Sequence, residues 1–312
     1  MLWGVTAYFN PAGYKSRLDN YLSFRKRLNA RLATVEMSTE GRFELGRDDA
    51  EILVQLSGGD VMWQKERLLN VALQYLPNEC DIVAWLDCDV VFDDDEWIAR
   101  TRSALDSFRL VQLFAERCDL FPCHDSKYPA ISARAPARGY KIATGLYRDE
   151  RDHRDAGIFV ADYSVPGHAW AARRDLLDKH GLYDARIVGS GDIAILAAAT
   201  GEFDHYFRSH AMNPRQVRHF RNWADPFFGD VAGSVGYISG RIFHLWHGDR
   251  KDRQYAIRQQ TALRAGFDPF TDIALDASGC WRWNSDKPEL HRDLREYFAS
   301  RNEDDPPQLR KP

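Results

Sequence analysis

Two aspartates separated by one residue stand directly after a short apolar run. Residues 82–86 read Ile-Val-Ala-Trp-Leu, and Asp87, Cys88 and Asp89 follow at once. Such a run predicts a buried β-strand, and alternation along an extended chain places Asp87 and Asp89 on the same side, about 7 Å apart. Carboxylate oxygens at the end of a buried strand can hold Mg²⁺ or Mn²⁺ together with water and a substrate phosphate. The stretch therefore indicates a metal site.

A purely structural role for the same stretch is also open. Asp87 could begin a turn and Asp89 could cap the next element, as residues 93–95 are expected to do for a helix that ends near Phe108. Two carboxylates buried without a cation are costly, however. We therefore favour the metal site over the turn.

Two histidines three residues apart form a second candidate group. His244 and His247 close a strand-like stretch, and Arg250 and Lys251 follow. Histidine nitrogens can complete a Mn²⁺ shell begun by a carboxylate, and the two cations can neutralise a departing diphosphate. We favour His247 as the ligand because Gly248 gives it access to a phosphate. The alternative, a core His244 and a surface His247, stays open.

The elements that must position these groups follow a β-α-β pattern. Residues 2–9 and 32–37 have the composition of strands, and the segment between them has helical spacing over 18–28. A third strand is predicted over 52–56, and a helix over 62–76 precedes the strand that ends at Asp87. Crossovers of this length imply parallel strands whose carboxyl ends meet at one edge of the sheet.

That edge gathers further polar candidates for a bound nucleotide. Thr6 and Tyr8 lie near the end of the first strand. Glu36 lies near the end of the second, where its carboxylate could bind a base or ribose or could simply be a solvated strand end. Lys65 lies near the start of the 62–76 helix, where the helix dipole disfavours a cation and an anionic partner would help; a solvated lysine is the alternative.

The order of these segments resembles the nucleotide-sugar half of GT-A glycosyltransferases. The matching segments read LVQLSGGD, WQKERLLNVAL and DIVAWLDCDVVF. In that family a helix with a Lys/Asn pair, here Lys65 and Asn70, precedes the strand that carries an Asp-x-Asp motif. The resemblance implies that Asp87 approaches the ribose or the metal-bound phosphate. It also implies that Asp89 binds the metal that bridges the diphosphate.

A second segment resembles the acceptor side of the same family. Gly-Leu-Tyr-Asp at 181–184 is followed by Gly-Ser-Gly-Asp at 189–192, and residues 170–179 predict a helix ahead of them. In those enzymes a carboxylate deprotonates the acceptor hydroxyl, so the resemblance makes Asp192 the general base. A plain helix cap is the alternative for Asp192. His247, with His244 beside it, resembles the metal histidine of the family.

Together these features predict an α/β fold of the GT-A (Rossmann-like) type, with a mostly parallel central sheet flanked by helices. Residues 1–120 are expected to form the nucleotide-sugar-binding half. Residues 121–300 are expected to form a fused acceptor-binding half that completes the metal site. Residues 301–312, which are charged and rich in proline, are expected to be a disordered tail. At 312 residues and 44% hydrophobic content, the chain can bury such a core.

Composition restricts where the protein is expected to be located and which partners it is expected to bind. No apolar run approaches about 18 residues, and the N-terminus lacks the layout of a signal peptide. Five cysteines, an odd number, favour free thiols, so we expect a cytoplasmic protein with no membrane span. A net charge of -4 gives no global attraction to nucleic acid. A locally basic segment within 121–155 could contact an acidic acceptor or be a solvated face.

The sequence therefore predicts a hexosyltransferase that uses Mn²⁺ or Mg²⁺. It would move a sugar from a nucleoside diphosphate sugar, with a UDP-sugar favoured, to an acceptor hydroxyl with inversion. The expected acceptor is a glycan, and a hydroxylated base in DNA, as in phage-type DNA glycosyltransferases, is the lesser alternative. Two other classes compete: a metal-dependent phosphohydrolase acting on nucleotide-sugars, and a non-catalytic sugar- or nucleotide-binding module.

Overall fold

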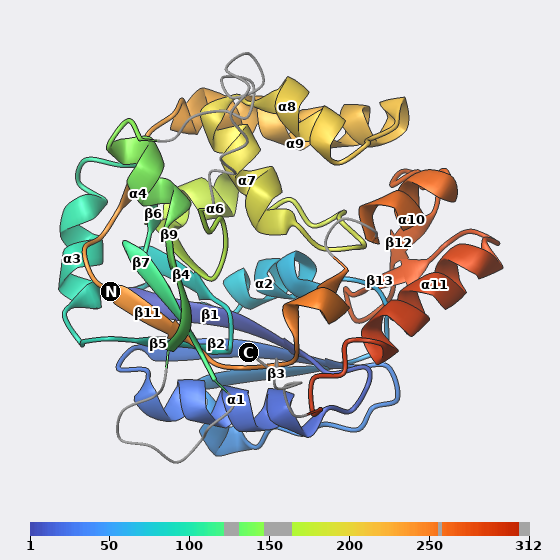
Figure 1. The fold of residues 1–312 in the computed structure, drawn as a ribbon, viewed down its shortest axis with the longest axis horizontal. Coiled ribbons are helices and arrows are strands. Elements are labelled where there is room, and N and C mark those ends of the chain that lie inside the picture. The colour runs from blue at the N-terminus through green and yellow to red at the C-terminus, as the bar shows by residue number, and fades with distance from the viewer. Residues whose placement is uncertain (122–130, 147–163, 255–257, 306–312) are drawn as a thin grey trace, which may run out of the picture.

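The structure is a computed structural model, and it describes residues 1–121, 131–146, 164–254 and 258–305. A seven-stranded sheet in the order β10-β6-β9-β4-β1-β2-β3 runs through its centre (Figure 1). The strands of this sheet are β1 (Leu2–Phe9), β2 (Arg31–Ser38), β3 (Ile52–Ser57), β4 (Ile82–Leu86), β6 (Leu110–Gln112), β9 (Ala169–Arg173) and β10 (Val235–Tyr237).

The central sheet is mostly parallel, as the sequence predicted. β1 pairs in parallel with β2 and β4, β2 with β3, and β6 with β10. β9 alone runs antiparallel to both of its neighbours, β4 and β6. Parallel strands require crossover connections: helix α1 (Lys15–Arg27) connects the neighbours β1 and β2, and helix α2 (Lys65–Leu73) lies in the connection from β3 to β4.

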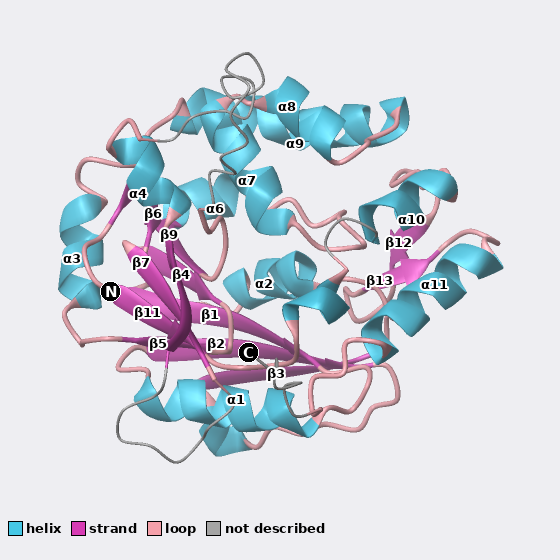
Figure 2. Ribbon diagram, in the orientation of Figure 1, coloured by secondary structure: helices cyan, strands magenta, loops and turns pink. Residues whose placement is uncertain are grey.

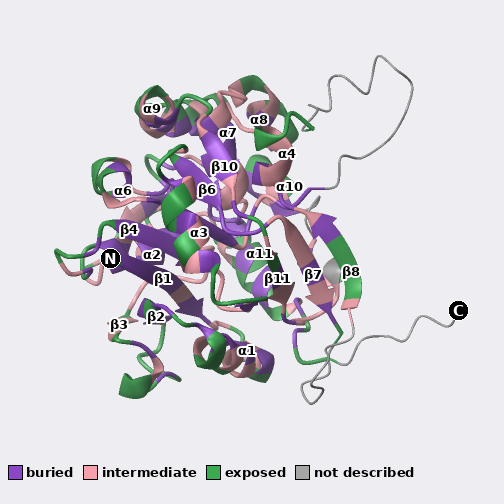
Figure 3. Cartoon of the chain, turned by 90° about the vertical axis from the view of Figure 1, so that its left-hand side faces the viewer, coloured by how far each residue is buried: buried purple, intermediate pink, exposed green. Residues whose placement is uncertain are grey.

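Both faces of the sheet are covered by helices (Figure 2). Alternation along β4 sends Val83 and Trp85 into the core shared with α2, and it sends Ile82 and Ala84 into the core shared with α1 and α3 (Trp97–Ala104). All residues of β4 are buried, and the central strands are purple in Figure 3. An apolar strand covered on both faces is what residues 82–86 predicted.

A smaller mixed sheet lies beside the central one. Its order is β5-β11-β7-β8, and its strands are β5 (Val90–Phe92), β7 (Glu116–Leu120), β8 (Ile131–Pro136) and β11 (Arg241–His244). β11 is parallel to β7 and antiparallel to β5. This pairing brings the histidine-bearing stretch beside the segment that follows Asp89.

Most of the remaining elements lie in the second half of the chain. β12 (Ile273–Leu275) and β13 (Trp281–Trp283) form a two-stranded ribbon. The helices are α4 (Arg138–Ala143), α6 (Arg174–His180), α7 (Gly191–Thr200), α8 (Phe203–Ser209), α9 (Pro214–Val231), α10 (Arg258–Arg264) and α11 (Pro288–Ala299), and the short 3-10 turns are η1 (Arg47–Asp49) and η2 (Arg250–Arg253). Within the described ranges, no helix combines the length and apolar content that crossing a bilayer requires.

The helix predicted over 170–179 is wrong in its first part. Residues 169–173 form β9, and the helix begins only at Arg174. Ala-Trp-Ala-Ala fits a helix locally, but the segment lies between β4 and β6, with Trp170 opposite Trp85 and Ala172 opposite Leu110. Pairing on both edges and full burial outweigh the helix preference of alanine.

The predicted disordered tail is also wrong where the structure describes it. Arg301 and Glu303 are buried, with 5% and 0% of their surfaces exposed. Their charges, which suggested solvation, are satisfied by one another and by distant arginines. Residues 306–312 lie outside the described part of the chain. Because β9 and β10 come from residues beyond 120, both predicted halves contribute to the central sheet, and the boundary near 120 stays a prediction.

Candidate active site

The Asp87–Asp89 segment leaves β4 at its carboxyl end and is held there by two later segments. The Asp87 amide donates a hydrogen bond to the carbonyl of His168 at 2.7 Å, and the Leu245 amide donates to the carbonyl of Asp89 at 2.8 Å. The acidic pair therefore sits where the turn before β9 and the end of β11 converge. Side chains from three remote parts of the chain meet at this point.

One cation and three carboxylates form the first group, which we call the Lys65 cluster: Lys65, Glu66, Asp87 and Asp192. Lys65 Nζ lies 2.9 Å from Asp87 Oδ1, 2.9 Å from Asp192 Oδ2 and 3.9 Å from Glu66 Oε1. Burial alone would lower the pKa of Lys65, but the three carboxylates raise it well above its usual value. Lys65 is thus a fixed positive charge between Asp87 and the predicted base.

The carboxylates of the Lys65 cluster differ in their protonation. Burial would raise the pKa of Asp87, yet Lys65 and His168 hold it below its usual range. Burial raises the pKa of Asp192, and Lys65 opposes that rise. Burial raises the pKa of Glu66 to about 7. Asp87 is therefore the permanently charged member, while Asp192 accepts a proton more readily than an ordinary aspartate.

Asp192 lies in the first turn of α7, but it is not the helix cap. Ser190 occupies the N-cap position, with a left-handed φ of 73°. The loop around Asp192 is tightly packed, because a Cβ on Gly167 would lie 2.7 Å from Asp192 Oδ2 and one on Gly191 would lie 2.0 Å from Glu66 Oε1. Glycine at both positions lets the backbone approach these carboxylates closely.

Histidines and a carboxylate form the second group, on the other side of the acidic pair. Asp89 Oδ2 lies 3.2 Å from His247 Nε2, and Asp89 Oδ1 lies 3.8 Å from His244 Nε2. The two histidines contact each other through their Nε2 atoms at 2.8 Å. Asp89, His168 and His244 each offer one donor atom, and these atoms lie within 4.8 Å of one another. Such a set can hold a divalent cation.

Two further observations fit a cation at this group. Asp89 Oδ1 and His168 Nδ1 are buried, and neither has a hydrogen-bond partner among the described residues; His168 Nδ1 comes no closer than 3.4 Å to Asp87 Oδ2. Burial lowers the pKa of His168, which favours the neutral imidazole that a metal requires. Asp89 Oδ1 thus offers a buried lone pair to an ion. Because Arg117 donates to His168 Nε2, the neutral ring carries its proton on Nδ1, and this proton must move to Nε2, in place of the Arg117 hydrogen bond, before Nδ1 can bind a metal.

A second layer of side chains orients the histidines. Asp119 Oδ1 lies 2.9 Å from His244 Nδ1, and Arg117 holds the other oxygen of Asp119 at 2.7 Å. Arg117 also donates to His168 Nε2 at 3.1 Å. A carboxylate that accepts from Nδ1–H directs Nε2 of the same ring toward a metal. His168, Arg117 and Asp119 were not predicted from the sequence as parts of the site.

Two of the predicted nucleotide contacts, Thr6 and Tyr8, make hydrogen bonds within the protein. Thr6 is buried, and its Oγ1 donates to the carbonyl of Leu86 at 2.7 Å. Tyr8 is also buried, and its hydroxyl donates to Glu44 Oε2 at 2.8 Å. Thr6 thus ties β1 to the end of β4, directly ahead of the acidic pair. A nucleotide contact for either side chain stays a prediction.

Glu36 and Asn70 likewise brace loops at the sheet edge. Glu36 is 2% exposed, and its carboxylate accepts from the backbone amide of Leu45 and from Gln55 Nε2, the latter at 2.8 Å. Asn70 exchanges two hydrogen bonds with the backbone of Leu182, at 2.7 and 2.8 Å. Glu36 is therefore not a solvated strand end, and Asn70 holds the loop that leads toward Asp192. Their nucleotide contacts stay predictions.

Of the two cations predicted after His247, the structure describes the side chain of Lys251 alone. Lys251 is exposed, and its Nζ lies 3.7 Å from Asp249 Oδ2. The side chain of Arg250 lies outside the described part of the chain. Arg253 reaches the site instead, because its Nη2 donates to the carbonyl of His247.

Arg253 belongs to a third charged group, the Glu303 cluster, made of Glu303, Arg17, Arg253 and Arg301. Glu303 Oε1 lies 3.1 Å from Arg253 Nη1 and 2.7 Å from Arg301 Nε, and Glu303 Oε2 lies 2.7 Å from Arg17 Nε. The backbone of this C-terminal segment packs on Gly248, where an added Cβ would lie 2.9 Å from the carbonyl oxygen of Arg301. The end of the chain thus braces the loop that carries His247.

Comparison with known proteins gives remote structural likenesses only. No family model matches the sequence, and no curated protein matches it. Among solved structures, glucosyl-3-phosphoglycerate synthase from Mycobacterium tuberculosis, in complex with Mn²⁺, UDP and phosphoglyceric acid, is 13% identical, with 88% of this chain and 81% of that chain covered and a TM-score of 0.41.

Two further solved structures have a similar degree of likeness. Staphylococcus aureus TarS 1–349 in complex with UDP-GlcNAc is 10% identical over 96% of this chain and 72% of that one, with a TM-score of 0.39. The Drosophila β1,4-galactosyltransferase 7 complex with manganese, UDP-Gal and xylobiose is 10% identical over 93% of this chain and 99% of that one, with a TM-score of 0.38. We base the functional assignment on the residues of this chain.

Proposed function

We propose that this chain is a metal-dependent glycosyltransferase of the GT-A type. It moves a sugar from a nucleoside diphosphate sugar, with a UDP-sugar favoured, to a hydroxyl of a glycan acceptor, with inversion at the anomeric carbon. The observation that carries the proposal is the position of Asp89 and Asp87. At the end of one buried strand, Asp89 faces the histidine group, and Asp87 shares Lys65 with Asp192.

The metal would be held by Asp89, His168 and His244, with His247 against the same carboxylate. A donor set of one carboxylate and several imidazoles suits Mn²⁺ better than Mg²⁺, which prefers oxygen ligands and water. When bound, the ion supplies a Lewis acid that offsets the negative charge of the departing diphosphate. Asp87 contacts Lys65, so we assign it to binding of the sugar donor. We rank it below Asp89 as a metal ligand.

The protein residues then have distinct tasks in the transfer. Asp192 takes the proton of the acceptor hydroxyl as the hydroxyl oxygen bonds to the anomeric carbon. The bond from that carbon to the diphosphate oxygen breaks, and the electron pair leaves with the nucleoside diphosphate. Lys65, fixed by Asp87, holds the Asp192 carboxylate in place before the acceptor arrives. The raised pKa of Asp192 suits a group that must accept a proton near neutral pH.

The competing classes fit these observations less well. A phosphohydrolase of this kind would prefer two metal ions a few ångströms apart, whereas the described residues contain one group of metal-capable side chains. A binding module would have no use for a buried carboxylate with a raised pKa beside the site. A DNA acceptor rested on the basic segment within 121–155, and about half of that segment, residues 122–130 and 147–155, lies outside the described residues.

Donor binding is the first test. Thermal stability of the full chain is measured with a panel of nucleoside diphosphates and their sugars, with and without Mn²⁺. We expect stabilisation by one nucleotide that depends on Mn²⁺ and that disappears in Asp89→Asn. Asp95→Asn, the same change at an exposed aspartate six residues further on, serves as the matched control and should respond like the unaltered protein.

Turnover separates the transferase from the alternatives. Once the donor is known, release of nucleoside diphosphate is followed with and without a mixture of saccharide acceptors. We expect Asp192→Asn to bind the donor normally and to lose transfer by about 10²-fold or more. Rapid donor breakdown without any acceptor would favour the phosphohydrolase. Unchanged transfer in Asp192→Asn would remove that residue as the base.

A further inference from the structure

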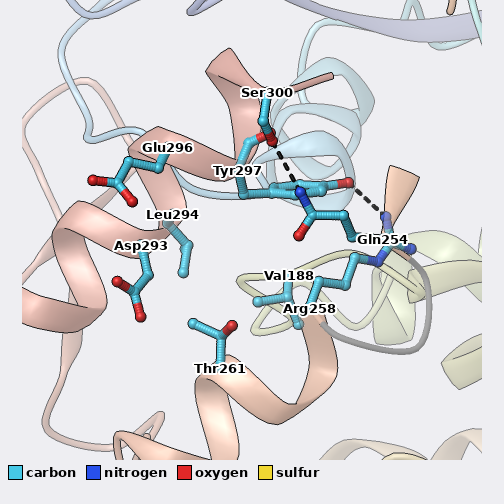
Figure 4. A pocket seen from close by; sticks show the side chains of 9 residues that line it. All are labelled: Val188, Gln254, Arg258, Thr261, Asp293, Leu294, Glu296, Tyr297 and Ser300. Carbon is cyan, nitrogen blue, oxygen red and sulfur yellow. Dashed lines mark hydrogen bonds between the residues drawn. The ribbon is translucent and has the colours of Figure 1, made fainter. Parts of the chain in front are cut away.

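A cavity of about 300 Å³ lies outside the three charged groups, between the loop that leads into α7 and helices α10 and α11 (Figure 4). Its size is at the lower end of ligand pockets, which span roughly 300–1,000 Å³. Apart from Val188 and Leu294, most of its lining is polar, including Gln254, Arg258, Asp293, Glu296, Tyr297 and Ser300. None of these residues was predicted as part of a site.

One wall of the cavity is held rigidly. Arg258 Nη1 donates to the Tyr297 hydroxyl at 2.8 Å, and Gln254 Nε2 donates to Ser300 Oγ at 3.0 Å (Figure 4). Arg258 and Tyr297 are each only 7% exposed, and the Arg258 guanidinium lies 5.6 Å from the centre of the Trp63 ring. This wall therefore offers oriented polar groups and an aromatic ring whose positions are set before a ligand arrives.

The opposite wall is acidic, but its charge is locally balanced. Figure 4 shows the Asp293 and Glu296 carboxylates on one side of the cavity, away from the Tyr297 hydroxyl. Arg292 directly precedes Asp293 on α11, and its guanidinium is 3.9 Å from Asp293 Oδ1 and 3.9 Å from Glu296 Oε1. Because each carboxylate already has a cation nearby, a neutral ligand with hydroxyl donors suits this wall better than a second cation.

The cavity is coupled to the predicted base through a short loop. Val188, which lines the cavity, precedes Asp192 by four residues, and four residues of chain span at most about 14 Å. Gln259, the neighbour of Arg258 on α10, donates to Ser190 Oγ at 2.9 Å. The cavity and the loop that carries Asp192 are therefore neighbours, and α10 contributes Arg258 to the one and contacts the other through Gln259.

We propose that this cavity is a saccharide subsite, which binds a sugar unit of the acceptor while another hydroxyl of the same molecule reaches Asp192. Carboxylates accept hydrogen bonds from sugar hydroxyls, the Tyr297 ring packs on the apolar face of a pyranose, and Gln254 and Ser300 supply neutral polar contacts. The proposal rests on the proposed function, and it makes the acceptor an oligosaccharide or glycoside.

The test is saturation-transfer NMR on the full chain, with methyl glycosides of common hexoses and N-acetylhexosamines as probes, in the presence of UDP and Mn²⁺. We expect one class of glycoside to bind and its affinity to fall about tenfold or more in the double variant Asp293→Asn/Glu296→Gln, which removes two charged acceptors. Glu289→Gln, an exposed carboxylate earlier on the same helix, is the matched control and should bind as before.

Each outcome decides between the alternatives. No glycoside binding, equal binding in the double variant, or binding of spermidine in place of glycosides overturns the subsite. The same samples report the UDP signal, so loss of UDP binding in the unaltered protein counts against the proposed function, and normal UDP binding without any glycoside counts against the subsite alone. Tyr297→Phe, which keeps the ring but removes the hydroxyl held by Arg258, should weaken the glycoside and leave UDP binding intact.

Discussion

The Lys65 cluster and the Glu303 cluster are near mirror images in charge. In the first, one ammonium is surrounded by three carboxylates, and in the second, one carboxylate is surrounded by three guanidiniums. Both combine residues that are remote in sequence, and both contain groups that are almost fully buried. Buried surplus charge is costly in either case, so the two clusters must resolve the same problem in different ways.

Exposure distinguishes the two clusters. In the Lys65 cluster the side chains of Lys65, Asp87 and Asp192 are 18%, 24% and 18% exposed. Glu66, the fourth member, is 2% exposed. In the Glu303 cluster, Glu303, Arg253 and Arg301 are 1%, 5% and 6% exposed, and only Arg17, at 23%, is partly open. The acidic cluster is open at the carboxyl ends of the strands, where ligands of α/β proteins bind. The basic cluster is closed by the end of the chain.

The difference indicates which cluster is built for function. A surplus of negative charge that stays partly open can be neutralised by a bound cation or a proton. The surplus of positive charge around Glu303 is buried against the site itself, since Arg253 donates to the carbonyl of His247 and the charge of Asp89 contributes to the raised pKa of Arg17. We infer that the Glu303 cluster is a support and the Lys65 cluster a working site.

The largest expected effect is on stability, from the closed cluster. Glu303→Gln leaves the buried guanidiniums of Arg253 and Arg301, and the partly exposed one of Arg17, without their carboxylate. The free energy of unfolding in urea should therefore fall by about 3–5 kcal/mol. Glu79→Gln, an exposed carboxylate, should change it by less than about 0.5 kcal/mol. Asp192→Asn should lose less free energy of unfolding than Glu303→Gln, because Lys65 still has Asp87 as an ion-pair partner. Equal losses of stability in Asp192→Asn and Glu303→Gln would contradict a supporting role for the Glu303 cluster alone.

A smaller effect is expected on metal affinity, at the group of Asp89 and the histidines. Asp119→Asn removes the carboxylate that orients the His244 ring, and loss of such a partner costs roughly 10–100-fold in metal affinity. Calorimetric titration of Mn²⁺ in the presence of UDP measures it, with Asp95→Asn as the control that should be unchanged. If Asp119→Asn binds Mn²⁺ as tightly as the unaltered protein, His244 is not a ligand.

A third effect is a change in the pH dependence of stability, from Glu66. Its pKa is about 7 in the folded protein against a usual 4.5, so the folded state holds a proton that the unfolded state has lost. Stability from this group is complete below the unfolded pKa and declines as pH rises through the folded one.

Glu66→Gln isolates this contribution because it cannot ionise. As pH rises from 4.5 to about 7, the interval between the two pKa values, the unaltered protein loses stability from this group and the variant does not. The free energy of unfolding of Glu66→Gln should therefore increase relative to that of the unaltered protein. Urea unfolding at several pH values measures the difference. The same comparison with Glu79→Gln should give a flat line. A flat line for Glu66→Gln as well would mean that Glu66 is ionised in the folded protein.

Local patterns predicted the first part of the fold well. The strand at 82–86, the helix that carries Lys65 and the parallel arrangement all agree with the structure. They could be predicted because apolar periodicity reports the burial of each element, and because short crossovers restrict the topology. Asp87 and Asp89 were found for the same reason, since carboxylates directly after a buried strand are conspicuous.

The errors came from segments whose state depends on remote partners. Residues 169–173 became a strand because β4 and β6 flank them, and Glu303 is buried because of Arg17, which lies 286 residues earlier. His168 gave no signal in the sequence beyond a turn after Pro166 and Gly167, although its left-handed φ of 84° is what turns it into the site.

The sequence by itself determined the α/β pattern, the position of the acidic pair at the end of a buried strand, and the candidate residues Lys65, Asp192 and the histidine pair, of which it favoured His247 over His244. Only the tertiary structure decided which of these charged side chains pair with one another. Lys65 bridges to Asp192 across 127 residues, and His244 is oriented by Asp119 across 125. Periodicity carries information about burial within an element, whereas the partner of a buried charge is set by which elements pack together.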